Sequence, residues 1–186
     1  KIKMLGYELF PAPVELPCPQ GVTGKLCDRK QSLMDLAART SPQSALEVTG
    51  IAVMCNQDPF NPTPSLTSTC DRKIARNQVV VAAAPHMHLL GRSLKITANP
   101  GTANEKVLLN NTNYNFDDQS SKVLAEPFKL KAGDTVRVQC TFDPTLRQKL
   151  PVLRKLPAKY VTWGEGSSDE MCLGVLINSK ETSIKS

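Results

Sequence analysis

Alternation of apolar and polar positions predicts a chain built mainly from short strands. The clearest case is 135–142, where Val136, Val138, Cys140 and Phe142 would share one face of a strand and polar residues the other. Further strands are expected at 5–9, 47–54, 79–89, 93–97, 106–109, 123–130, 159–163 and 171–178. Short alternating strands at this spacing predict an all-β fold, an antiparallel β-sandwich.

One segment has helical periodicity instead. Over 28–40 the apolar positions Leu33, Leu36 and Ala37 share a helical face, and Pro42 is expected to mark the end of this helix. Because cysteines flank the segment on both sides, we expect 18–69 to be a small disulfide-stapled helical insertion on the β framework.

Length and composition favour a single ordinary globular domain over 1–186. Of its 186 residues 40% are hydrophobic and 22% charged. No run approaches the ~18 consecutive apolar residues of a membrane span, so no membrane partner is expected. The chain begins with Lys1 rather than methionine, and we expect a mature form or a piece of a longer precursor.

Six cysteines, an even number, indicate disulfides and a secreted protein or another oxidising extracytoplasmic compartment. Six cysteines allow about 15 connectivities, among which sequence alone does not choose. Proximity along the chain favours pairing Cys18 with Cys27 and Cys55 with Cys70, which leaves Cys140 for Cys172.

The net charge of +6 comes in part from a basic stretch, Arg147, Lys149, Arg154, Lys155 and Lys159. A nucleic-acid groove would interleave stacking aromatic residues with its basic ones, and this stretch has one aromatic residue near its end. We therefore expect a solvated loop here and no nucleic-acid partner.

The two histidines of the chain, His86 and His88, stand at positions i and i+2 of a predicted strand and would project from the same face. The opposite face, expected to be core, would consist of Val79, Val81, Ala83, Met87 and Leu89. Two neutral imidazoles side by side form half of a metal site. The alternative is a pair of solvated histidines on a sheet surface.

A third donor is suggested by the strand that begins near Met171. If Cys172 faces the core to reach Cys140, Met171 faces outward, as the histidines do. Two imidazoles and a thioether suit copper, especially Cu(I), although methionine more often fills core space. The preceding acidic residues Glu165, Asp169 and Glu170 are expected in a solvated loop, with the alternative that one of them orients a metal ligand.

Two segments, 86–92 and 167–172, closely resemble the second copper domain of the copper type II, ascorbate-dependent monooxygenases, a family that includes peptidylglycine α-hydroxylating monooxygenase and dopamine β-monooxygenase. The resemblance covers about residues 70–178 well and residues 1–17 faintly. It implies a sandwich of jelly-roll type in which His86, His88 and Met171 bind one copper that activates O2, with ascorbate as the reductant, to hydroxylate a substrate C–H bond.

The same resemblance implies a disulfide between Cys140 and Cys172. Cys70 matches a family cysteine whose partner lies after the methionine strand. This chain has no cysteine after Cys172, so Cys55 is the expected partner of Cys70.

The departures from the family pattern matter as well. Family enzymes hold a second copper with three histidines on a preceding domain, and this chain has only two histidines. Peptide-hydroxylating members have an arginine that holds the substrate carboxylate where this chain has Ala84. They also have a tyrosine where this chain has Val175, so a less polar small molecule is expected. Two functions remain open: the catalytic domain of a monooxygenase that works with a second copper domain outside this chain, or a secreted copper-binding module without turnover of its own.

Overall fold

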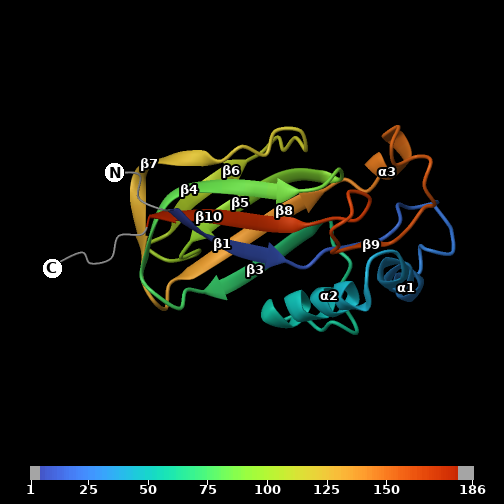
Figure 1. The fold of residues 1–186 in the computed structure, drawn as a ribbon, viewed down its shortest axis with the longest axis horizontal. Coiled ribbons are helices and arrows are strands. Elements are labelled where there is room, and N and C mark those ends of the chain that lie inside the picture. The colour runs from blue at the N-terminus through green and yellow to red at the C-terminus, as the bar shows by residue number, and fades with distance from the viewer. Residues whose placement is uncertain (1–4, 180–186) are drawn as a thin grey trace.

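The computed structural model describes residues 5–179 and forms a sandwich of two four-stranded antiparallel sheets (Figure 1). The first sheet has the strand order β1-β10-β4-β7, the second has the order β3-β8-β5-β6, and β2 pairs with β9 in a small separate sheet. The strands are β1 (Leu5–Ala12), β2 (Glu15–Leu16), β3 (Thr67–Lys73), β4 (Gln78–Met87), β5 (Gly91–Ala98), β6 (Lys106–Asn111), β7 (Lys122–Leu130), β8 (Thr135–Phe142), β9 (Val161–Thr162) and β10 (Cys172–Ser179). The helices are α1 (Arg29–Arg39), α2 (Pro42–Met54) and α3 (Leu146–Lys149).

The hydrophobic core lies between the two large sheets. The predicted inward face of β8 is confirmed, since Val136, Val138, Cys140 and Phe142 are all buried. Opposite them the first sheet contributes Phe10, Val80 and Leu176, each at most 2% exposed. The predicted antiparallel sandwich is therefore confirmed, and the jelly-roll connectivity implied by the resemblance stays a prediction.

The core face of β4 differs from the prediction in its first half. The pairing register with β10 shifts at Val81, because Ile177 pairs with Ala82 and Asn178 with Val80, which makes Val81 the extra residue of a β-bulge. The extra residue changes the phase of the alternation, so Val80 is buried whereas Val79 and Val81 are not. After the bulge the prediction is confirmed for Ala83 and Met87.

The same strand leads into a turn that follows the histidines. There the predicted core residue Leu89 is only partly buried, and its neighbour Leu90 is fully buried instead. The cause is the turn itself, in which the Gly91 amide donates to the His88 carbonyl and ends the strand alternation.

The predicted helix over 28–40 is confirmed as α1. The Asp28 side chain caps it by accepting a 2.9 Å hydrogen bond from the Gln31 amide, and Leu36 is buried. The predicted strand at 47–54 is wrong, because this segment is the second half of the helix α2. Pro42 stands in the first turn of α2, where its missing N–H is not needed, and does not simply mark the end of α1.

Both disulfides favoured from chain proximity are present, and the second of them joins the helical segment to the sandwich. Cys18 pairs with Cys27, and Cys55, just after α2, pairs with Cys70 in β3. Figure 1 shows α1 and α2 next to each other at the end of the sandwich toward which β4 points. Among residues 5–179 no helix is long and apolar enough to cross a membrane.

Candidate metal centre

The two histidines lie at the end of β4. His86 is on the strand and His88 directly follows it, and their ring centroids are 5.3 Å apart with perpendicular planes. His86 is partly buried, and His88 is only 5% exposed, so His88 is not the solvated surface histidine of the alternative reading. Burial lowers the pKa of His88, which favours the neutral imidazole that a metal requires.

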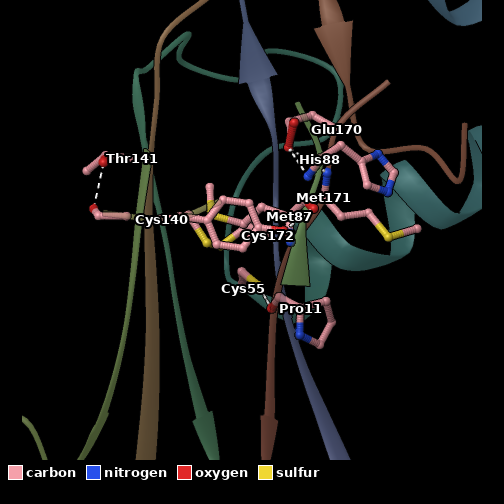
Figure 2. Close-up of a disulfide and its surroundings, with 11 residues drawn as sticks. Pro11, Cys55, Met87, His88, Cys140, Thr141, Glu170, Met171 and Cys172 are labelled. Atoms are coloured by element: carbon pink, nitrogen blue, oxygen red, sulfur yellow. Dashed lines mark hydrogen bonds between the residues drawn. A yellow bond between two sulfur atoms is a disulfide. The ribbon is translucent and has the colours of Figure 1, made fainter. Parts of the chain in front are cut away.

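The pairing of β4 with β10 brings the start of β10 next to the end of β4. In the β4–β10 register Cys172 is opposite Met87, and Leu173 is opposite His86. Cys172 and Met87 are fully buried between the sheets, whereas Met171 and Leu173, on either side of Cys172, are only partly buried and pack against this core. Figure 2 shows the His88 ring and the Met171 thioether on the same side of the two strands, away from the disulfide of Cys172.

The Cys140–Cys172 disulfide holds the strand that presents Met171. It joins β8 of one sheet to β10 of the other, with a Cα–Cα distance of 5.8 Å, and both cysteines are fully buried. The pairing implied by the resemblance is therefore confirmed. Because Met171 precedes Cys172 directly, this cross-link restrains the backbone on which the thioether is carried.

The Glu170 side chain forms hydrogen bonds both with the turn that contains His88 and with the backbone of Met171. This side chain is fully buried and accepts hydrogen bonds from three backbone amides, those of His88 at 2.8 Å (Figure 2), Leu90 at 3.0 Å and Met171 at 3.3 Å. Burial raises the pKa of Glu170 to about 8, against the opposing effect of these three donors. The expectation of a solvated carboxylate is wrong for this residue, which bonds to the backbone of both segments that carry the candidate ligands.

Asp169 is likewise buried, contrary to the expected solvated loop. Its backbone carbonyl accepts a 3.3 Å hydrogen bond from Nδ1 of His88, while its carboxylate binds Lys159 at 2.5 Å and Arg39 at 3.0 Å. Burial lowers the pKa of Lys159, and the Asp169 carboxylate opposes that effect. Helix α1, through Arg39, thus helps to position the loop that contacts His88.

The basic stretch is also partly internal. Arg147 is 5% exposed and donates to the carbonyl oxygens of Pro157 and Ser168, and Lys159 is 4% exposed. The expectation of a solvated basic loop is therefore wrong for these two residues. Arg147 bonds to backbone carbonyl groups before Met171, and Lys159 binds the Asp169 carboxylate, so neither charge faces solvent.

The loop between β6 and β7 contacts both histidines. Gln119 Oε1 lies 2.6 Å from His86 Nδ1, and the Phe116 ring meets the His88 ring edge-on at a centroid distance of 6.2 Å. Tyr114 in the same loop donates to the Met87 carbonyl and accepts from the Met87 amide. Sequence reasoning missed these contacts, because nothing in the local pattern of this polar segment connects it to β4.

The candidate donor set expected from the sequence consists of the two imidazoles of His86 and His88 and the thioether of Met171. Within residues 5–179 no group of three or more His, Cys, Asp and Glu side chains could hold a metal ion, so the geometry offers no carboxylate-rich site for a hard cation. Nitrogen donors and a soft sulfur fit copper, and Cu(I) in particular. Three donors leave open positions at which such a metal could bind a further small ligand.

Comparison with known proteins agrees with this chemistry. A solved structure described as a GH26-CBM35 β-(1,4)-mannanase of Podospora anserina is 11% identical and matches 96% of this chain and 29% of its own, with a TM-score of 0.31, too low to carry an argument. The sequence model of a protein family, the copper type II ascorbate-dependent monooxygenase C-terminal domain, matches residues 45–185. The match begins within α2 and therefore includes part of the segment interpreted as an insertion. This match spans most of the chain and both segments that carry the candidate ligands. The chain therefore belongs to the family of copper type II, ascorbate-dependent monooxygenases and contains their C-terminal domain.

Proposed function

We propose that this domain binds one copper ion through His86, His88 and Met171 and uses it in the hydroxylation of a substrate C–H bond. The observation that supports the proposal is that the His86 and His88 ring centroids are 5.3 Å apart and that the Met171 thioether lies on the same side of the strands as the His88 ring (Figure 2). Copper bound there would supply the redox chemistry that activates O2, with ascorbate as the reductant. The protein contributes the donor geometry, and the buried Glu170 supports it by hydrogen bonds from the backbone amides of His88 and Met171.

The surroundings of the donors favour a substrate of low polarity. Ala84 and Val175 are directly opposite each other in the β4–β10 register, on the face that carries His86. Leu173, opposite His86, is apolar as well. None of these side chains can bind a carboxylate, so we propose a small, weakly polar substrate and not a peptide with a terminal carboxylate.

The proposed reaction needs a second source of electrons. A three-histidine copper site cannot be assembled from a chain with two histidines, both of which are assigned to the first site. The domain is therefore proposed to work with a second copper domain outside this chain. Its three disulfides are consistent with an oxidising extracytoplasmic compartment, and we propose that the protein is secreted.

An anaerobic competition titration with Cu(I) tests the metal assignment. Wild type should bind one equivalent, whereas His86→Ala and Met171→Ile should bind more weakly. The matched control is Met34→Ile, because Met34 lies on α1 and is 59% exposed. Equal stoichiometry and affinity in all four proteins would exclude these residues as the ligands.

The alternative function is a copper-binding module without turnover of its own. Product formed per O2 consumed, measured with ascorbate over benzylic and aliphatic substrates, separates the two. The proposed enzyme should hydroxylate substrate once a partner domain with the second copper is supplied, and should do so with poor coupling as the chain alone. Copper binding without hydroxylation under either condition would favour the module.

A further inference from the structure

Gln119 makes a short hydrogen bond to one of the candidate copper ligands. Its Oε1 lies 2.6 Å from Nδ1 of His86, although the two residues are 33 positions apart in the sequence. Gln119 is in the loop between β6 and β7, a loop that contributes no candidate metal ligand. Its contact with His86 therefore calls for a role other than coordination.

The orientation of the Gln119 amide is determined by a second hydrogen bond. Its Nε2 donates to the Phe116 carbonyl at 2.9 Å, so its oxygen is the atom that faces His86. A tight turn supports this arrangement, because the Asp118 amide donates to the Asn115 carbonyl at 3.1 Å. The side chain of Gln119 is thus held at both ends of its amide.

An amide oxygen only accepts hydrogen bonds, so the proton between these two atoms must belong to His86 Nδ1. In the neutral imidazole the other nitrogen, Nε2, then keeps its lone pair and can bind a metal. His88 has a comparable contact, from its Nδ1 to the Asp169 carbonyl at 3.3 Å. A side chain restrains one imidazole and the backbone restrains the other.

We propose that Gln119 is the positioning residue that holds His86 as the Nδ1-protonated tautomer and presents Nε2 to copper. This inference rests on the proposed function. Without the Gln119 oxygen, His86 could carry its proton on either nitrogen and its ring could rotate, and both changes reduce the population ready to bind metal. Loss of such a supporting hydrogen bond weakens metal binding by about 10- to 100-fold.

The first measurement uses the metal-free protein and does not depend on activity. Long-range ¹H–¹⁵N correlation spectra, recorded where the imidazoles are neutral, report which nitrogen of each histidine carries the proton. Wild type should show His86 protonated on Nδ1, and Gln119→Leu should show a mixture of tautomers. Gln119→Glu retains an acceptor oxygen and should restore the single tautomer.

The second measurement is Cu(I) affinity of the same proteins by competition. Gln119→Leu should bind copper about 10- to 100-fold more weakly than wild type. The matched control Gln139→Leu, at an exposed position on β8 of the other sheet, should match wild type in both measurements. Finding His86 protonated on Nε2 in wild type, or no change of tautomer and affinity in Gln119→Leu, would overturn the proposal.

These two measurements separate the inference from the proposed function. If the tautomer responds to Gln119→Leu as expected but wild type binds no copper, the proposed function fails while the control of the His86 tautomer by Gln119 is upheld. If wild type binds copper through its histidines and the tautomer does not respond, Gln119 has no positioning role.

Discussion

Replacing Glu170 by glutamine should destabilise the fold and loosen the candidate copper site together. The carboxylate accepts from the amides of His88 and Met171 through Oε2 and from the amide of Leu90 through Oε1. Glutamine keeps one acceptor oxygen and turns an NH2 group toward at least one of these amides, so a buried donor loses its partner. A buried unpaired polar group costs about 1–3 kcal/mol.

From these hydrogen bonds we expect Glu170→Gln to lower the free energy of unfolding by about 2–3 kcal/mol. Glu170→Ala leaves all three amides unpaired and should lower it by about 3–5 kcal/mol, less than three times the single loss because such losses are not additive. Urea denaturation at about pH 9, followed by circular dichroism, gives both values, because above the raised pKa of about 8 the Glu170 carboxylate is ionised and accepts all three hydrogen bonds. The matched control is Glu165→Gln, five residues earlier and exposed, which should stay within about 0.5 kcal/mol of wild type.

The same variant should weaken copper binding, because Glu170 bonds to the backbone of His88 and of Met171 and thus fixes their separation. The reasoning would be refuted if Glu170→Gln unfolded like Glu165→Gln. It would also be refuted if Glu170→Gln lost stability yet bound Cu(I) as tightly as wild type, since the carboxylate would then have no effect on the donor geometry.

Two further predictions concern the core behind the site. Replacing Cys140 and Cys172 together by alanine opens a cross-link with a sequence separation of 32 residues, and urea denaturation should show a loss of about 3–4 kcal/mol; a loss below about 1 kcal/mol would contradict this. Gly174→Ala would place a Cβ 2.7 Å from a Val138 methyl group between the sheets and should lower the free energy of unfolding by about 1–3 kcal/mol. The control Gly6→Ala, with nothing within 4 Å of the added Cβ, should leave stability unchanged. Equal stability of the two variants would refute the close packing.

Strands with a regular two-residue alternation could be predicted from the sequence, and β8 is the clearest example. The helix α2 could not, because its β-branched residues Val48, Thr49, Ile51 and Val53 favour a strand by propensity. Its buried residues Ser44, Val48, Ile51 and Ala52 follow helical spacing, and the proline in its first turn was the signal for a helix start.

The closeness of the His86 and His88 rings could be predicted from their spacing of two residues, and their centroids are 5.3 Å apart. Burial of Asp169 and Glu170 could not be predicted, since the partners of their carboxylates come from distant parts of the chain. An acidic run in a glycine-containing loop looks solvated until those long-range contacts are known.

X-ray absorption at the copper edge tests the central claim most directly, because it reports the atoms bound to the metal. The Cu(I)-loaded wild type should show a first shell of two imidazole nitrogens and one sulfur. Met171→Ile should lose the sulfur contribution, and Met34→Ile should retain it. A wild-type spectrum with nitrogen and oxygen donors only, or a sulfur shell unchanged in Met171→Ile, would contradict a copper site formed by His86, His88 and Met171.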